Sequence, residues 1–248
     1  MVWTAAAGDG PDVVVLVHGS MDRSAGLLKL SRRLDDRFRV VRYDRRGYGR
    51  STPHDGPFGM PDQVDDLRRV ILEAEPERCV VVGHSYGGNV ALALADHHPD
   101  LVDAVVTYES PLSWLPWWGG SAGSSAMEAR DDPAAAAERF MRSLIGDERW
   151  ERLPSGTRAA RRAEGAPMLG ELADLRAAPP WRPDRVTVPV LVLFGEHGRP
   201  HHRRGAEHLA DMLPDARLEM VPEAKHFGPN THPDDVAQRV LRFIDASG

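Results

Sequence analysis

The chain of 248 residues contains one cysteine, only two lysines among 31 basic residues, and no apolar run long enough to span a bilayer. A single cysteine, Cys79, excludes an intrachain disulfide, so disulfide pairing gives no information on the redox compartment. Residues 1 to 12 lack the basic and apolar regions of a signal peptide. We therefore expect a cytoplasmic protein without a membrane span.

The charge balance is mildly acidic, with a net charge of −6 at pH 7 and a pI near 6.0. Proteins that bind nucleic acids usually present a net basic face, so this balance argues against nucleic acid as a partner. A small-molecule substrate fits better. No pattern in the sequence indicates an oligomeric state. The hydrophobic content of 42% is enough for the sizeable core of one α/β domain.

Apolar runs alternate with helical patterns along most of the chain, which predicts an α/β fold with a mostly parallel central sheet flanked by helices. The expected strands are 12–17, 38–43, 78–82, 101–108, 188–194 and 216–221, with a short edge strand near 2–5. The expected helices are 24–36, 61–75, 89–98, 201–213 and 233–245. Residues at the carboxyl ends of these strands are the candidates for function.

The alternation breaks after Glu109 for about seventy residues. No strand pattern appears in residues 112–183, whereas 133–145 and 156–177 have helical composition. We therefore expect a core formed by residues 1–111 and 184–248, with a mainly helical insertion at 112–183.

The motif Gly83-His84-Ser85-Tyr86-Gly87 lies between an apolar run and a helical pattern. Small residues two positions either side of Ser85 let the backbone turn tightly and expose the serine hydroxyl above the sheet. A serine hydroxyl needs a base within hydrogen-bond reach to act as a nucleophile, and His226, after the last strand, is the candidate base. The alternatives are a serine that caps the following helix and a histidine in a surface loop.

These residues, with His18-Gly19, the loop Asp44 to Ser51 and the strand end Gly195-Glu196, resemble the α/β-hydrolase fold superfamily over nearly the whole chain. The resemblance implies a serine-nucleophile member of the esterase or lipase type, in which nucleophile, acid and histidine follow in that order. It also implies that the helical insertion is a lid over the site. Members of the family usually begin with further strands, so the sheet edge of this chain is expected to be abbreviated.

The acid is the point at which this sequence departs from the family. Most relatives carry the catalytic Asp at the position of Gly198. Two carboxylates can replace it, namely Glu109 at the end of the preceding strand and Glu196. Some family members, including haloalkane dehalogenases, place the acid at the earlier strand end, whereas Glu196 also occurs in relatives that keep the Asp. We predict Glu109, with Glu196, the lack of an acid, and a Glu109 paired with an arginine as alternatives.

Attack on a carbonyl places negative charge on its oxygen, which two backbone N–H groups must stabilise. Tyr86 offers one at the start of its helix. By resemblance Ser20 offers the other, with Met21 as its neighbouring substitute. His18 is expected to hold this loop by hydrogen bonds.

The insertion begins with three tryptophans close to the expected acid. An apolar segment near a strand end is expected to line the substrate pocket. The alternative is that these rings pack the insertion onto the core. The tryptophans are Trp114, Trp117 and Trp118.

A metal site is not expected. His197, His201 and His202 are close in sequence, but Gly198 and Pro200 interrupt the helical spacing that an i, i+4 ligand pair needs. The sequence has no cysteine pair, acidic calcium loop or phosphate-binding loop of the G-x-x-x-x-G-K-[ST] type. We therefore expect no cofactor.

Together these features predict a serine hydrolase that cleaves a carboxylic ester or lactone of a small hydrophobic substrate through an acyl-enzyme intermediate. A serine nucleophile, in place of an aspartate, argues against dehalogenation and epoxide opening through an alkyl-enzyme. The alternatives are perhydrolase, C–C hydrolase or lyase chemistry on the same fold, and a ligand-binding protein that does not hydrolyse its ligand.

Overall fold

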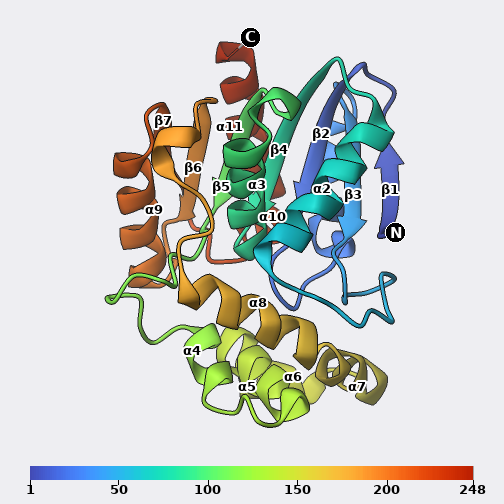
Figure 1. Ribbon diagram of the computed structural model, residues 1–248, viewed down its shortest axis with the longest axis vertical. Coiled ribbons are helices and arrows are strands. Elements are labelled where there is room, and N and C mark those ends of the chain that lie inside the picture. The colour runs from blue at the N-terminus through green and yellow to red at the C-terminus, as the bar shows by residue number, and fades with distance from the viewer. Residues whose placement is uncertain (248) are drawn as a thin grey trace.

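The computed structural model describes residues 1–247 (Figure 1). One seven-stranded sheet has the order β1-β3-β2-β4-β5-β6-β7. The strands are β1 (Trp3–Ala7), β2 (Asp12–Val17), β3 (Arg39–Asp44), β4 (Arg78–His84), β5 (Ala104–Tyr108), β6 (Val190–Gly195) and β7 (Ala216–Val221). Only β1 runs antiparallel to its neighbour, β3. The predicted mostly parallel sheet is therefore confirmed, and β1 is its N-terminal edge.

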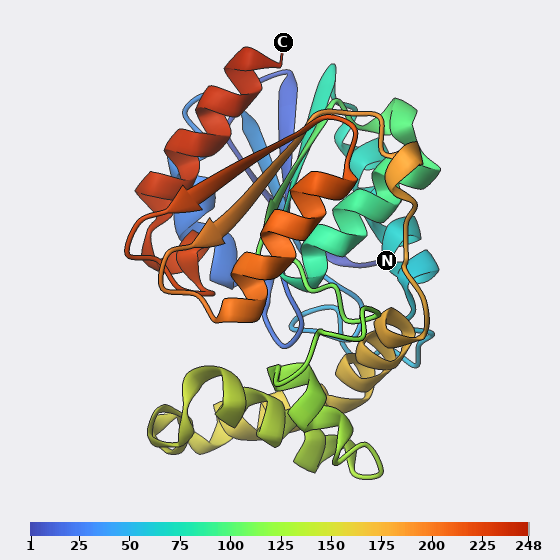
Figure 2. The same ribbon diagram turned by 90° about the vertical axis from the view of Figure 1, so that its left-hand side faces the viewer.

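Helices cover both faces of the sheet (Figures 1 and 2). The helices on one face are α2 (Met60–Ala74), α3 (Tyr86–His97) and α9 (Pro200–Met212). Those on the other are α1 (Leu28–Leu34) and α11 (Pro233–Ala246). Along β2, Val13, Val15 and Val17 pack on the first side, whereas Val14 and Leu16 pack on the second. The strand is a continuous apolar run because both of its faces are buried.

Short helical turns complete the connections between these elements. They are η1 (Ser24–Leu27), η2 (Pro99–Leu101), η3 (Pro183–Arg185) and α10 (Gly228–Thr231). No helix within residues 1–247 combines the length and the apolar character needed to cross a membrane.

Between β5 and β6 the chain leaves the sheet and forms five helices within residues 112–183, the region expected to be the insertion. Its helices are α4 (Ala122–Met127), α5 (Pro133–Ile145), α6 (Asp147–Arg152), α7 (Ser155–Ala163) and α8 (Gly165–Ala177). Figures 1 and 2 show them together below the carboxyl ends of the parallel strands. Helices α4, α5, α6 and α8 share an apolar cluster that includes Trp150 and Met168, whereas α7 has no buried residue. The region of helical composition over 156–177 forms two helices. They meet where Gly165 passes too close to Pro133 for a side chain, since a Cβ there would lie 1.9 Å from the Pro133 carbonyl oxygen.

Candidate active site

Ser85 lies at the turn between β4 and α3, with φ of 53° and ψ of −124°. Few residues other than glycine adopt such a backbone conformation, and strain of this kind is typical of functional sites. The neighbouring glycines permit the turn: a Cβ on Gly83 would lie 2.4 Å from the Gly87 carbonyl oxygen, and one on Gly87 would lie 2.3 Å from that of Val17. The tight turn places the Ser85 side chain at the carboxyl end of the sheet.

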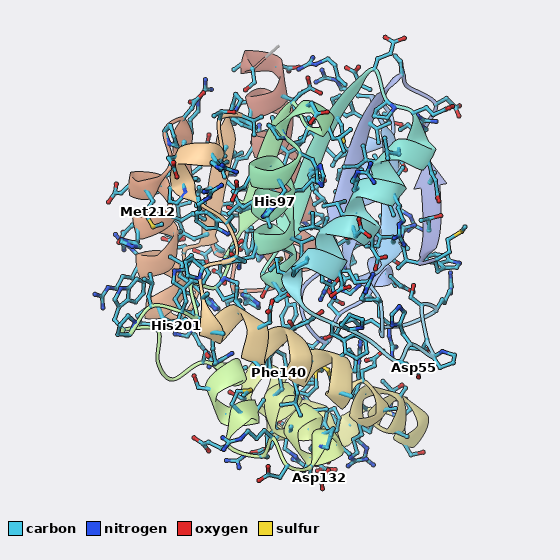
Figure 3. The ribbon with its side chains drawn as sticks, viewed as in Figure 1. Asp55, His97, Asp132, Phe140, His201 and Met212 are labelled. Atoms are coloured by element: carbon cyan, nitrogen blue, oxygen red, sulfur yellow. The ribbon has the colours of Figure 1, made fainter. Side chains whose placement is uncertain are left out.

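A cavity of about 390 Å³ lies between this end of the sheet and the insertion. Ser85 and His226 both line it, so the structure brings these two predicted residues to one site. The insertion contributes apolar side chains to the cavity wall, including Leu172 and Phe140. Figure 3 labels Phe140. Phe140 also belongs to the apolar cluster of the insertion. The cavity thus combines polar groups from the sheet with an apolar wall from the insertion.

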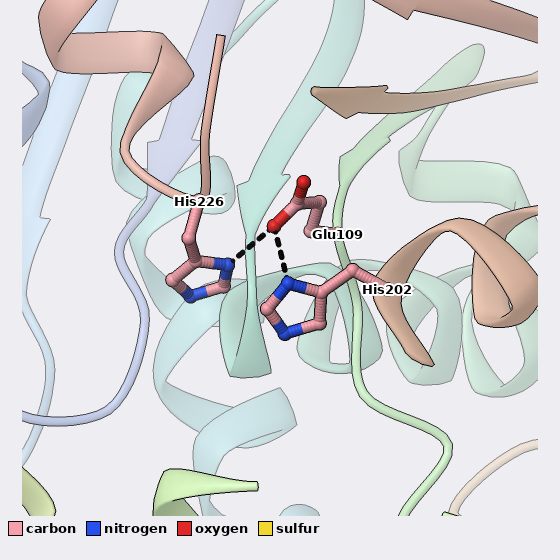
Figure 4. A group of neighbouring side chains, drawn as sticks. All are labelled: Glu109, His202 and His226. Carbon is pink, nitrogen blue, oxygen red and sulfur yellow. Dashed lines mark hydrogen bonds and ion pairs between the residues drawn. The ribbon is translucent and has the colours of Figure 1, made fainter. Parts of the chain in front are cut away.

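Glu109 directly follows β5, with φ of 47° and a side chain that is almost fully buried. One carboxylate oxygen, Oε2, accepts a hydrogen bond from His226 Nδ1 at 2.7 Å, and Oε1 accepts one from the Gly195 N–H at 3.0 Å (Figure 4). The exposed Glu196 instead accepts a hydrogen bond from the Glu223 N–H at 2.9 Å. Of the two candidate acids, Glu109 is the one in contact with His226.

Gly198 lies directly beside this carboxylate. A Cβ on Gly198 would lie 2.4 Å from Glu109 Oε1. Glu109 therefore occupies the space that a side chain at position 198 would enter. A side chain at position 198 and the Glu109 carboxylate in this position therefore exclude each other.

The loop that carries His226 is held by side chains from two strand ends. His84 Nε2–H donates to the His226 carbonyl oxygen at 2.7 Å, and Tyr108 Oη donates to that of Lys225 at 2.8 Å. With Nδ1 bonded to Glu109, the other ring nitrogen of His226 points away from the carboxylate (Figure 4). Within residues 1–247 no hydrogen bond joins this ring to Ser85 Oγ. Such bonds are often long in ligand-free enzymes and shorten when substrate binds.

His202, in the first turn of α9, is a second imidazole on the same carboxylate. Its Nδ1 lies 2.6 Å from Glu109 Oε2, and its ring stacks on His226 with a centroid separation of 4.5 Å (Figure 4). From the sequence we considered His202 only as a metal ligand, and we did not predict its contact with Glu109. The local indication was that His202 follows shortly after the end of β6, at the carboxyl edge of the sheet, where functional residues are expected.

The surroundings of Glu109 and His226 shift their pKa values in a consistent direction. Burial opposes ionisation of Glu109, but the hydrogen bonds from His202 and His226 outweigh it and hold the pKa of the carboxyl below its usual range. Burial, reinforced by the charge of His202, lowers the pKa of His226 despite the contact with Glu109. At neutral pH the arrangement therefore has an ionised carboxylate beside a neutral imidazole that can accept a proton.

Within residues 1–247, two groups of side chains bring potential metal ligands within 4.8 Å of one another. One is Glu109, His202 and His226, and the other is the exposed group Glu196, His197 and Glu223. In the first group the N–O separations of 2.6 and 2.7 Å are hydrogen-bond distances. Two atoms that share a zinc ion at about 2.0–2.2 Å lie further apart than this. The first group therefore fits a hydrogen-bonded charge arrangement better than a metal centre.

Ser20 and Tyr86 line the cavity beside Ser85. Tyr86 is the first residue of α3, so its N–H has no acceptor within the helix. The loop that carries Ser20 passes close to the serine, because a Cβ on Gly19 would lie 2.9 Å from Ser85 Cβ. Two backbone N–H groups in these positions can stabilise an oxyanion formed on a carbonyl bound to Ser85.

His18 holds this loop by hydrogen bonds. Its Nδ1–H donates to the Gly19 carbonyl oxygen at 2.8 Å, and its Nε2 accepts from the Arg45 N–H at 2.9 Å. Burial and the charge of Arg45 lower the pKa of His18 well below its usual value, so the ring is neutral. Met21, with φ of 58°, is buried beside a smaller cavity of about 80 Å³ that also touches Ser85.

A buried ion pair joins the loop after β3 to the insertion, and the loop that carries Ser20 bonds to the same glutamate. Glu171 of α8 and Arg45 are both fully buried and contact each other. Ser20 Oγ donates to Glu171 Oε2 at 2.9 Å, and Tyr48 Oη donates to it at 2.8 Å. The sequence gave no indication of this network, because Ser20 and Glu171 are 151 positions apart.

Replacement of Glu171 by alanine is expected to lower the free energy of unfolding by about 3–5 kcal/mol, because Arg45 would stay buried without a counter-charge. Urea denaturation followed by tryptophan fluorescence measures this loss. The control is Glu128→Ala, which removes a solvent-exposed partner of Arg139 and is expected to cost under about 1 kcal/mol. Equal losses in the two variants would contradict the prediction.

The three tryptophans expected near the site have different surroundings in the structure. Trp118 lines the cavity, but Trp114 and Trp117 are not among its lining residues. Trp114 packs edge-on against Trp181 with a centroid separation of 5.7 Å, and Trp117 packs in the same way against His208. Both rings also pack against the apolar core on the α3 side of the sheet, which is the alternative role.

Comparisons with known proteins agree with this fold. Residues 14–239 match the family model described as the alpha/beta hydrolase family. A 2-(acetamidomethylene)succinate hydrolase from Mesorhizobium japonicum is 27% identical, covering 96% of this chain and 90% of its own. A pimeloyl-[acyl-carrier protein] methyl ester esterase from Pectobacterium atrosepticum is 30% identical, covering 96% of both chains. The crystal structure of an alpha/beta hydrolase from Sphaerobacter thermophilus has a TM-score of 0.78 at 24% identity, covering 98% of this chain and 96% of its own. The chain therefore belongs to the alpha/beta hydrolase family.

Proposed function

We propose that the protein is a serine hydrolase that cleaves a carboxylic ester or a lactone through an acyl-enzyme intermediate. The observation that carries the proposal is the strained turn at Ser85, in a cavity that also holds a His226 ring hydrogen-bonded to Glu109. The similarity to a methyl ester esterase at 30% identity supports ester chemistry over the other reactions of this fold.

In this mechanism His226 is the general base. Its Nδ1 donates to Glu109, so the neutral ring carries its free electron pair on Nε2, which takes the Ser85 proton. Ser85 Oγ then attacks the carbonyl carbon of the ester. The Glu109 carboxylate stabilises the imidazolium that forms, and His202 on the same oxygen acts as a positioning residue.

The negative charge that develops on the carbonyl oxygen is stabilised by the N–H groups of Tyr86 and Ser20. His226 returns its proton to the leaving alcohol, which leaves the acyl group on Ser85. Water then enters, loses a proton to His226 and attacks the acyl carbon. As this second intermediate collapses, His226 returns that proton to Ser85 Oγ, which releases the acid and restores the serine.

The cavity indicates the size of the substrate. A volume of about 390 Å³ suits a small molecule, and the apolar side chains of the insertion suit a hydrophobic part of it. We further propose that the insertion acts as a lid, because its helices form one wall of the cavity.

A panel of 4-nitrophenyl esters of increasing acyl length tests the proposal. We expect turnover with a burst of one nitrophenolate per protein molecule, and a mass increase equal to the acyl group on the peptide that contains Ser85. No turnover with any ester, or an acyl group on another residue, would refute the proposal. Tight ligand binding without turnover would favour the ligand-binding alternative.

Replacement of His202 by glutamine is expected to move the acidic limb of the pH–rate profile to higher pH. Activity requires neutral His226, and it falls as the pH drops through the pKa of His226. Burial lowers that pKa first and the charge of His202 lowers it further, so removal of the charge raises the pKa. At pH 7.5 we expect kcat/KM to fall about tenfold, as for one lost hydrogen bond.

The measurement is kcat/KM for a 4-nitrophenyl ester between pH 4.5 and 9. His208→Gln is the matched control, because His208 lies on the same helix and packs against Trp117 outside the cavity. An acidic limb that stays in place, or moves to lower pH, in His202→Gln would contradict the assigned role.

A further inference from the structure

The charged side chains that line the cavity are all of one sign. Within residues 1–247, the arginines and the lysine on its wall are Arg149, Arg176, Arg199 and Lys225, and no aspartate or glutamate lines it. The whole chain nevertheless has a net charge of −6. A positively charged cleft in an acidic protein raises the local concentration of anionic ligands.

These cations have no carboxylate partners. None of the four makes an ion pair among the residues that the structure describes. Elsewhere in the insertion, arginines are paired with nearby glutamates; the paired ones include Arg139, Arg142, Arg158, Arg161 and Arg162. Carboxylates are therefore abundant in the insertion, yet none is placed against the cavity.

Of these four residues, Arg176, in the last turn of α8, is partly buried and also has guanidinium N–H groups without a hydrogen-bond partner within residues 1–247. Its Nη1 donates to the Leu172 carbonyl oxygen at 2.9 Å, and its Nε and Nη2 have no partner in the described part of the chain. The lack of a side chain at Gly123 makes room for the guanidinium, because a Cβ there would lie 2.7 Å from Nη2. Burial lowers the pKa of Arg176, and no anion offsets this cost.

We propose that Arg176 binds a carboxylate of the substrate, so that the ester or lactone that is hydrolysed carries a second, ionised carboxyl group. A guanidinium presents parallel N–H groups that match the two oxygens of a carboxylate. Arg149, Arg199 and Lys225 attract the anion without fixing its position. The inference rests on the proposed function and narrows its substrate from a small ester to a small acidic ester.

Two pairs of esters test this, one with the charge on the acyl side and one with it on the alcohol side. The pairs are monomethyl adipate with methyl adipamate, and 4-acetoxybutanoate with 4-acetoxybutanamide. Within a pair the two esters have the same length, and only one is charged. We expect kcat/KM for the anionic ester to exceed that for its amide at least tenfold in one pair, mainly through a lower KM. An equal or lower kcat/KM for the anionic ester in both pairs would overturn the inference.

Arg176→Gln is expected to bring this ratio close to one, and Arg176→Lys to restore part of it as a point charge. The matched control is Arg130→Gln, which removes an exposed positive charge from the same insertion at a residue that does not line the cavity. The ratio should stay at the wild-type value in this control. A ratio that falls equally in Arg130→Gln and Arg176→Gln would mean that only the overall charge matters, which would refute a specific role for Arg176.

Calorimetry on Ser85→Ala separates failure of this inference from failure of the proposed function. We expect hexanoate to bind at least tenfold more tightly than hexanamide, and Arg176→Gln in the same background to abolish the difference. If wild type cleaved no ester while this difference persisted, the proposed function would fail and the anion site would stand. Hexyl phosphate that bound more than tenfold more tightly than hexanoate would overturn the assignment to a carboxylate.

Discussion

Ser85→Ala is expected to lower kcat for ester hydrolysis by about 10⁶-fold, the loss seen when a serine nucleophile is removed from a catalytic triad. The oxyanion donors and the cavity would remain, so a small rate above that of free water should persist. The backbone should keep its conformation, because the contacts of Gly83 and Gly87 define the turn and the serine hydroxyl does not.

The measurement is the rate of 4-nitrophenyl ester cleavage at saturating substrate, with circular dichroism and thermal unfolding to show that the variant is folded. A folded Ser85→Ala protein that kept more than about 1% of the wild-type rate would exclude Ser85 as the nucleophile, since loss of a nucleophile removes far more than that. The same variant must also fail to form the acyl adduct.

Glu109→Gln should lower kcat by about 10⁴-fold, the effect of changing the triad acid to its amide. The amide keeps the shape of the side chain but lacks the charge that stabilises the imidazolium, and its NH₂ group favours the wrong tautomer of His226. Glu196→Gln is the matched control, because its carboxylate contacts the Glu223 N–H and not the imidazole. We expect the control to stay within about twofold of wild type, in the range of surface substitutions. A large loss in Glu196→Gln with a small one in Glu109→Gln would reverse the assignment.

The position of the acid can also be moved. Gly198→Asp alone is expected to lower kcat, because the new Cβ would lie 2.4 Å from Glu109 Oε1 and displace that carboxylate. Combined with Glu109→Gly, the same change has room and brings a carboxylate from the neighbouring loop. We expect the double variant to recover at least tenfold in kcat over Glu109→Gly alone, which would follow from about 1.4 kcal/mol of regained transition-state stabilisation. No recovery in a folded double variant would contradict the packing explanation for Gly198.

Much of the fold was readable from the sequence because its signals are local. The apolar runs in β2, β4 and β6 are continuous, whereas a strand with one exposed face alternates apolar and polar residues. They therefore predicted a sheet covered on both faces. Helix boundaries differ by a few residues, as for α3, which begins at Tyr86. The short helices α4 and α6 were not predicted, because segments of six residues carry little periodicity.

The sequence by itself identified the candidate nucleophile, since the spacing of Gly83, Ser85 and Gly87 predicts a tight turn with the serine at its centre. It also placed His226 after the last strand. For the carboxylate that contacts His226, the sequence offered both Glu109 and Glu196. Sequence spacing favoured Glu109 but did not decide between them. Tertiary structure decides this contact, because it depends on which side chain fills the space beside Gly198.

The tertiary structure alone revealed three further charged or polar groups in and behind the cavity wall. His202, Glu171 and Arg176 lie in helices whose sequences are compatible with ordinary surface or packing positions. They become distinctive because the fold brings them against residues far away in the chain: His202 against Glu109, Glu171 against Arg45 and Ser20. Arg176 is distinctive because no carboxylate of residues 1–247 pairs with it. The free energy of a buried charge depends on every group around it, and local sequence does not contain that information.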